Sequence, residues 1–161
     1  MSQEFFPEFE EGINDSPEPV QFFSEETDFI LSQQSCIIDW IKTIISKEDK
    51  ILRQINFILC TDNYLHKMNV EYLNHDTLTD IITFPYSDLP TIHGDIFISV
   101  ERVEENAKKF HTSFSDELHR VMIHGVLHLC GYGDKTAVEQ NLMRSKENEA
   151  LLLLKPGNKN L

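Results

Sequence analysis

The order of strand-like and helix-like segments along this chain is the feature that most constrains its fold. Segments 51–60, 80–86 and 94–100 are rich in β-branched and aromatic residues and are predicted strands, as is a short apolar run at 20–23. Apolar residues recur at helical spacing in segments 30–45, 62–72, 101–110, 115–129 and 136–154. Because strands come early and helices dominate late, we predict an α+β fold in which helices cover a small, mixed, four-stranded sheet.

Side chains at the helix starts add local detail. Thr61 is expected to cap the helix that follows it, because its hydroxyl can accept a hydrogen bond from a free backbone N–H. Thr136 and Glu139 have the spacing of a capping box. In the helix predicted at 30–45, isoleucines occupy one side, and Trp40 is expected to lie off that side.

Length and composition predict one domain. With 161 residues, 40% of them hydrophobic, the chain can bury one sizeable core. We expect a single domain at 20–154, between a disordered acidic arm at 1–19 and a flexible tail at 155–161. Residues 1–28 contain no apolar run long enough for a signal peptide or a membrane span. A soluble cytoplasmic protein without a membrane partner is therefore expected.

The cysteines also favour a cytoplasmic location. Cys36, Cys60 and Cys130 are odd in number and irregularly spaced, which is typical of buried thiols rather than of a disulfide framework.

The net charge of −13 disfavours binding to nucleic acid, because phosphate contacts need Lys and Arg. However, the charge is unevenly distributed. Residues 1–28 hold nine of the 27 acidic residues and no Lys or Arg, so the rest of the chain has 18 acidic against 14 basic residues. The body of the domain is only mildly acidic, and an RNA substrate stays open.

The segment HGVLHLCGYGD at 124–134 is the strongest candidate for a functional site. His124 and His128 are four residues apart in a predicted helix, so both imidazoles share one face. Gly131 can adopt the left-handed conformation that ends a helix, and the turn can bring Asp134 to the same place. Two imidazoles and one carboxylate leave a fourth tetrahedral position open, as in catalytic zinc sites. We predict that His124, His128 and Asp134 hold one divalent ion, zinc or another metal.

The residue after the first histidine disfavours ordinary peptidase chemistry. The spacing His-x-x-x-His-x-x-Gly-x-x-Asp matches the long zincin pattern, in which a Glu after the first His is the general base. This chain has Gly125 at that position. A metal ion with an open position instead suits phosphodiester hydrolysis, because it polarises a phosphoryl oxygen and lowers the pKa of water. The sequence identifies no catalytic residue beyond the metal ligands.

The same segment resembles the hallmark of the YbeY-type endoribonucleases, a family of ribosomal RNA maturation factors. The hallmark His-Gly-x-Leu-His-Leu-x-Gly-Tyr is matched at 124–132, and Asp134 is similar in position to the family's third ligand. Glu117 and Met143 lie where the family has a Glu before the metal helix and a Met on the last helix. Further matches are Tyr72, Thr79, Asp80, Phe84, Pro85, Gly94, Asp95 and Ile96. The resemblance covers about residues 20–154.

The resemblance implies a metal-dependent endoribonuclease that cuts single-stranded RNA. It implies a role in maturation of the 3′ end of 16S ribosomal RNA and in ribosome quality control, with ribosomal RNA and the small ribosomal subunit as partners. Two positions depart from the family. A family Arg that contacts RNA or stabilises charge corresponds to Leu73, and Lys135 and Arg102 are candidates for its role, with simple surface charge as the alternative. The third ligand is usually His, and Asp134 lowers the site's charge, so a harder metal could compete with zinc.

Other residues have two readings each. Asp80 and Asp95 are candidates to orient the metal-binding histidines, and capping of strand ends is the alternative. Buried packing is the better account of Cys130, and Met143 either belongs to the core or, from the resemblance, supports the metal from below. The remaining histidines of note are predicted surface residues: His75, His93, His111 and His119.

Two other functions stay open. A zinc-binding ribosome assembly factor with little intrinsic activity is favoured by Leu73 and the acidic charge. A metallopeptidase with a displaced general base is favoured only by the zincin-like spacing. A basic groove would favour the ribonuclease, because single-stranded RNA needs a cationic track with aromatic stacking. Its candidate residues are Lys42, Lys47, Lys67, Arg102, Lys108, Lys109 and Arg120.

Overall fold

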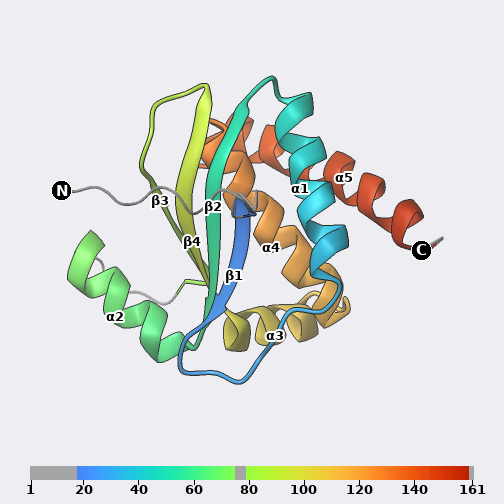
Figure 1. Cartoon of the computed structure of the whole chain (residues 1–161). Coiled ribbons are helices and arrows are strands. Elements are labelled where there is room, and N and C mark those ends of the chain that lie inside the picture. Colours follow the sequence, from blue (N-terminus) through green and yellow to red (C-terminus); the bar gives the residue numbers. More distant parts are fainter. Residues whose placement is uncertain (1–17, 75–78, 160–161) are drawn as a thin grey trace, which may run out of the picture.

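The computed structural model describes residues 18–74 and 79–159, which form a sheet with helices on both faces (Figure 1). In chain order the elements are β1 (Val20–Ser24), α1 (Gln34–Lys47), β2 (Ile51–Cys60), α2 (Asp62–Leu73), β3 (Ile81–Pro85), β4 (Thr91–Ser99), α3 (Val100–Lys109), α4 (Phe114–Leu129) and α5 (Ala137–Lys159). The strand order is β1-β2-β4-β3, with β1, β2 and β4 parallel and β3 antiparallel to β4. The predicted α+β fold with a mixed, four-stranded sheet is confirmed.

Alternate side chains of the central strands build separate cores on the two faces of the sheet. Ile55, Phe57 and Leu59 of β2 are buried in the larger core, which α1, α3, α4 and α5 cover. Ile58 and Cys60 belong to a smaller core under α2, which stands apart from the other helices in Figure 1. Because successive strand residues point to opposite faces, a side chain of β4 can reach only one of these two layers.

Two element starts and one side chain differ from the prediction for α1 and β4. Gln33 is left-handed, with φ of 57°, so α1 begins at Gln34 rather than at residue 30. Trp40, expected off the apolar side, is buried, and its Nε1 donates to the Ala150 carbonyl at 2.8 Å. β4 begins at Thr91, because residues 91 and 92 pair with the start of β2. The predicted start, Gly94, thus lies inside the strand.

The predicted helix caps are confirmed. The Thr61 hydroxyl accepts from the Tyr64 N–H at 3.2 Å. Thr136 accepts from the Glu139 N–H at 3.1 Å, while the Glu139 carboxylate accepts from the Thr136 N–H at 3.2 Å. The last helix extends to Lys159, past the predicted end at residue 154. Residues 1–17 of the predicted arm lie outside the described residues, and the domain boundaries stay predictions.

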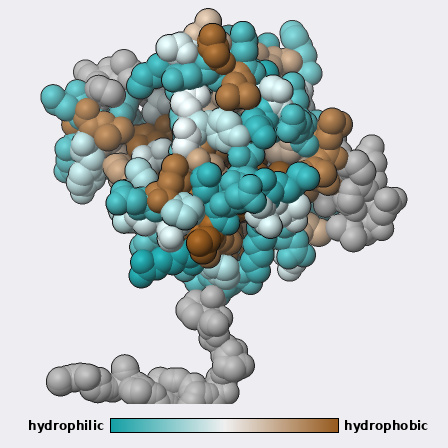
Figure 2. All heavy atoms as spheres, turned by 90° about the horizontal axis from the view of Figure 1, so that it is seen from above, coloured by the Kyte–Doolittle hydropathy of each residue, from teal (hydrophilic) through white to brown (hydrophobic). Residues whose placement is uncertain are grey.

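The surface has no single dominant apolar area in the view of Figure 2. Hydrophilic side chains cover most of the face seen there, and hydrophobic side chains form small separate groups. Scattered apolar side chains of this kind are normal on globular proteins. Of the helices in the described part of the chain, none combines the length and apolar character that crossing a bilayer requires.

Candidate metal centre

Helix α4 carries both histidines and lies close against the sheet. Ser113 caps its start by accepting from the Asp116 N–H at 3.0 Å. Gly125 faces the sheet, and a Cβ built there would lie 2.9 Å from Ile81 Cδ1 and 3.0 Å from Ile96 Cγ2. The position after His124 therefore has no space for the Glu of a zinc peptidase.

A tight turn after α4 returns the chain to the histidines. Gly131 has a φ of 110°, and its N–H donates to the His128 carbonyl at 3.0 Å. The Tyr132 N–H donates to the Leu127 carbonyl at 3.1 Å, which closes a helix end of the Schellman type. This turn brings Asp134 back to the histidines, as predicted.

The three predicted ligands meet at one point. The Asp134 Oδ2 lies 3.2 Å from His124 Nε2 and 3.1 Å from His128 Nε2. One ligand atom from each residue lies within 4.8 Å of the other two, and all three side chains are partly buried. Imidazole nitrogen and carboxylate oxygen suit zinc and similar divalent ions, and three protein ligands leave a coordination position for a reactant. The donor set therefore fits such an ion.

Each imidazole is also held by a hydrogen bond at Nδ1, the ring nitrogen that faces away from Asp134. His124 Nδ1 lies 2.6 Å from Glu147 Oε2, and His128 Nδ1 lies 2.8 Å from the Tyr132 carbonyl oxygen. An ionised carboxylate and a carbonyl can only accept, so in the neutral rings Nδ1 carries the proton. The Nε2 lone pairs then point toward Asp134. Fixing the tautomer in this way is typical of metal-binding histidines.

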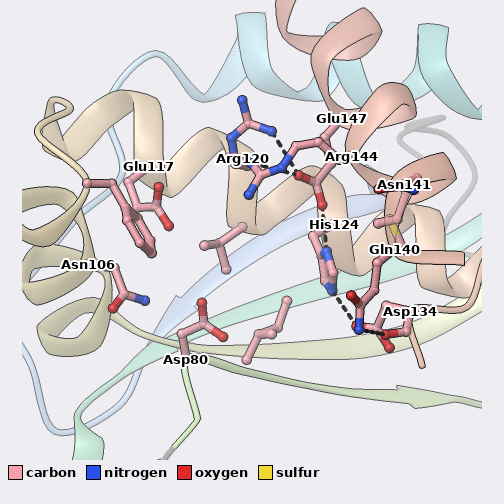
Figure 3. A pocket seen from close by; sticks show the side chains of 14 residues that line it. Asp80, Asn106, Glu117, Arg120, His124, Asp134, Gln140, Asn141, Arg144 and Glu147 are labelled. Atoms are coloured by element: carbon pink, nitrogen blue, oxygen red, sulfur yellow. Dashed lines mark hydrogen bonds and ion pairs between the residues drawn. The ribbon is translucent and has the colours of Figure 1, made fainter. Parts of the chain in front are cut away.

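Glu147 is the buried centre of a charged network (Figure 3). Its Oε1 accepts from Arg120 Nη1 at 2.8 Å and lies 3.6 Å from Arg144 Nη1. Burial alone would raise the pKa of Glu147, but its hydrogen bonds with His124 and Arg120 outweigh burial and lower it. Burial alone would likewise lower the pKa of His124, and the hydrogen bond and charge of Glu147, with the charge of Asp134, raise it instead. Glu147 therefore stays charged and keeps the His124 ring in place.

The prediction that Asp80 or Asp95 orients the histidines is wrong for Asp95, and no contact supports it for Asp80. Asp95 lies on the α2 face of the sheet, where it accepts from Asn56 at 3.0 Å and from Tyr86 at 2.7 Å. Asp80 lies in the pocket beside His124, without a hydrogen bond to it. Glu147 was missed, although it follows Met143 by one helical turn on the apolar side of α5. An acidic residue on the apolar side of a predicted helix could have indicated a buried, functional carboxylate.

A cavity of about 610 Å³ opens beside the metal centre and is shown in Figure 3. Arg120 and Arg144 line it, and Arg120 is the only one of the seven predicted groove residues that does so among the described residues. Arg102 instead pairs with Asp62 at 2.8 Å, and Lys135 is exposed and does not line this cavity. Among the described residues, the cations that line this cavity are therefore Arg120 and Arg144, rather than Arg102 and Lys135, the candidates predicted to replace the family Arg at Leu73.

The other described residues that the sequence singled out are mostly buried or half-buried. Cys130 is buried, as predicted, and burial raises the pKa of its thiol to about 11. Met143 is buried and also lines the cavity. His111 is exposed, as predicted, whereas His93 and His119 are half-buried against Tyr86 and Trp40, respectively. His75 lies outside the described residues.

Comparisons with known proteins agree with this geometry. The family model described as "Endoribonuclease YbeY" matches residues 22–155. A relative named endoribonuclease YbeY from Flavobacterium johnsoniae is 55% identical over 131 residues, which cover 81% of this chain and 94% of the relative. The relative of the same name from Cytophaga hutchinsonii is 48% identical over 139 residues, covering 86% of this chain and 97% of the relative.

A solved structure is also similar. The solution structure of TM1509 from Thermotoga maritima matches with a TM-score of 0.63 and 25% identity, covering 88% of this chain and 92% of that one. The family match spans the sheet, the metal helix and most of α5. This chain belongs to the YbeY endoribonuclease family.

Proposed function

We propose that the protein is a hydrolase that cleaves single-stranded RNA with one divalent ion, most simply zinc, held by His124, His128 and Asp134. The observation that carries this proposal is the convergence of both Nε2 atoms on one oxygen of Asp134, at 3.2 and 3.1 Å. Two histidines that share a carboxylate through Nε2, while each Nδ1 is hydrogen-bonded to another group, have the arrangement typical of metal ligands. The names of the relatives supply the reaction class, which is endoribonuclease.

Different residues would hold the metal ligands and bind the phosphate. A bound divalent ion would supply a Lewis acid for a phosphoryl oxygen and for the attacking water. Glu147 holds the His124 ring in one tautomer, and the Tyr132 carbonyl does the same for His128. Arg144 lines the cavity with a side chain that is 61% exposed, and it could turn from Glu147, 3.6 Å away, toward a phosphate. Its planar guanidinium can bind two phosphate oxygens at once.

Gly125 weakens the peptidase alternative further. Its contact with Ile81 and Ile96 excludes an acid at this position, so a peptidase would need its general base from another element. Phosphodiester cleavage needs positioning and charge stabilisation, which the two arginines and the ion can provide. Of the two proposed functions, the ribonuclease is therefore better supported than the metallopeptidase.

The proposed RNA substrate and cellular role are those that membership of the family implies. We propose that the substrate is ribosomal RNA, that cleavage matures the 3′ end of 16S ribosomal RNA, and that the protein works on the small ribosomal subunit in the cytoplasm as part of ribosome quality control. The support for this role is the family match over residues 22–155, together with an acidic body that needs a specific partner rather than general attraction to RNA.

The test compares the wild type with His128→Ala and Asp134→Ala. Bound metal is measured in each protein, together with cleavage of single-stranded fragments from the 3′ end of the small-subunit ribosomal RNA, with and without a chelator. Asp39→Ala, at an exposed position on α1, is the matched control. We expect both ligand variants to lose metal and cleavage together, and the control to keep both.

Two outcomes would contradict the proposed function. A wild type that binds metal but leaves every RNA intact would remove the nuclease and favour the assembly factor. Cleavage that survives in both metal-free variants would show that the metal centre is not the active site.

A further inference from the structure

The part of the cavity away from Asp134 has a different chemistry from the metal centre. Figure 3 shows Asp80, Asn106 and Glu117 directed toward the same space, with Asp134 on the other side of His124. Asp80 precedes β3, Asn106 comes from α3 and Glu117 from α4. We call these three residues, with Phe110 beside them, the acceptor end. Three separate elements thus bring hydrogen-bonding groups to one place.

Glu117 is the most informative member of the acceptor end. The residue is only 7% exposed, and its carboxylate makes no hydrogen bond or ion pair with any residue that the structure describes. Arg120 and Arg144 are near, but both pair with Glu147 instead. Burial, and then the charge of Asp80, raise the pKa of Glu117. A carboxylate that has no protein partner and limited access to water gains from new hydrogen bonds, so N–H donors from a ligand would be favourable here.

The other members of the acceptor end define the shape and polarity of that ligand. Asp80 adds a second carboxylate on a half-buried residue, and burial raises its pKa as well. Asn106 adds a side-chain amide, which can donate to a carbonyl oxygen. Phe110 lines the same cavity with a ring that is 56% exposed and so offers a flat apolar surface. A flat ligand with several N–H donors and one acceptor would match all four residues.

We propose that the acceptor end is a nucleobase subsite that selects guanine in single-stranded RNA. Proteins recognise single-stranded RNA by stacking splayed bases on aromatic rings and by hydrogen bonds to their Watson–Crick edges. Guanine presents adjacent N1–H and N2–H donors to a carboxylate, and its O6 accepts from an amide such as that of Asn106. Uracil presents one N–H between two carbonyl oxygens, which carboxylates repel. This inference rests on the proposed function, because it assumes that RNA enters the cavity.

The substrate-side test needs no variant. The metal-loaded wild type is given short single-stranded uridine oligomers that carry one central guanosine, inosine, adenosine or cytidine, and an all-uridine oligomer. We expect kcat/KM for cleavage beside guanosine to exceed that of the all-uridine oligomer by roughly tenfold to a hundredfold, the range for a good bidentate contact. Inosine lacks the N2 amino group and is expected to lose most of this preference.

The protein-side test uses variants that keep the size of the side chain. Glu117→Gln replaces one acceptor oxygen by a donor, so the ratio of guanosine to uridine cleavage should fall to within about threefold of one. Asp80→Asn should lower the same ratio. Glu105→Gln, at an exposed position on α3, is the control and should keep the wild-type ratio. The ratio is informative even if a variant is less stable, because both substrates are cut by the same folded molecules.

The outcomes separate this inference from the proposed function. Equal cleavage of all oligomers by the wild type would overturn the guanine subsite and leave the nuclease intact. A guanosine preference that survives in both variants would also overturn it. A wild type that cuts none of the oligomers would instead remove the proposed function, and this inference with it.

Discussion

The Glu147 carboxylate lies 2.6 Å from Nδ1 of His124, so a buried acid on the last helix orients a metal-ligand candidate 23 residues earlier. Residues that orient metal ligands typically contribute tenfold to a hundredfold in metal affinity. We therefore expect Glu147→Gln to weaken zinc binding by roughly tenfold or more, because the amide can present its N–H to Nδ1 and favour the wrong tautomer.

The measurement for Glu147 is zinc affinity by competition with a chromogenic chelator. Glu149→Gln is the matched control, since Glu149 lies on the same helix but is exposed. Because Glu147 also pairs with Arg120, the stability of the metal-free protein is measured alongside. Equal zinc affinity in the folded Glu147→Gln and Glu149→Gln proteins would contradict an orienting role.

Gly125 sets the distance between the metal helix and the sheet. In Gly125→Ala the new Cβ would meet Ile81 and Ile96 at about 3 Å, so side chains or backbone must shift. Overpacking of this kind costs about 1–3 kcal/mol of unfolding free energy. Urea unfolding would measure the loss. Ser145→Ala, at an exposed position on α5, should stay within about 0.5 kcal/mol of the wild type, and an equally small effect at Gly125 would argue against the close contact.

We expect Asp134 to influence which metal the site prefers. A carboxylate is a harder ligand than an imidazole, so the wild type should bind manganese better, relative to zinc, than Asp134→His does. The two affinities are measured by competition in both proteins, and Asp134→Asn shows the effect of removing the charge at constant size. The same manganese-to-zinc ratio in the wild type and in Asp134→His would show that Asp134 does not tune the metal.

We expect Cys60 to make the folded protein less stable at alkaline pH. Burial raises its pKa from 9.0 to about 12, so the folded state holds the thiol proton more tightly than the unfolded chain does. The stabilisation is complete below pH 9 and is lost as the pH rises toward 12, at up to about 1.4 kcal/mol per pH unit. Unfolding free energies measured across this range should fall less steeply in Cys60→Ala. Parallel curves for the two proteins would exclude Cys60 as the cause.

The correct predictions are those that depend on residues close in sequence. The spacing of His124 and His128 places both rings on one helical face whatever else the chain does. Gly131 ends that helix through a left-handed turn, and Asp134 follows within reach of both rings. The capping box at Thr136 is equally local. Such features follow from the helical repeat and from backbone conformation.

The missed features depend on how distant elements pack. Asp95 was a predicted candidate to orient the metal-binding histidines, but it lies on the other face of the sheet, because strand residues alternate in direction. Trp40 could not be assigned to the core until α5 was in place to accept its hydrogen bond. Arg144 lies beside the cavity only because α5 packs along α4.

The fold class and the family could be predicted from the order of the segments and from several short motifs, and the three candidate metal ligands from one short run of residues. Only the packing of distant elements shows that Glu147 contacts His124 and that Glu117 faces the cavity without a hydrogen-bond partner among the described residues. Those contacts join residues of different helices and strands, and their distances depend on side-chain packing across the whole domain, which local spacing does not define.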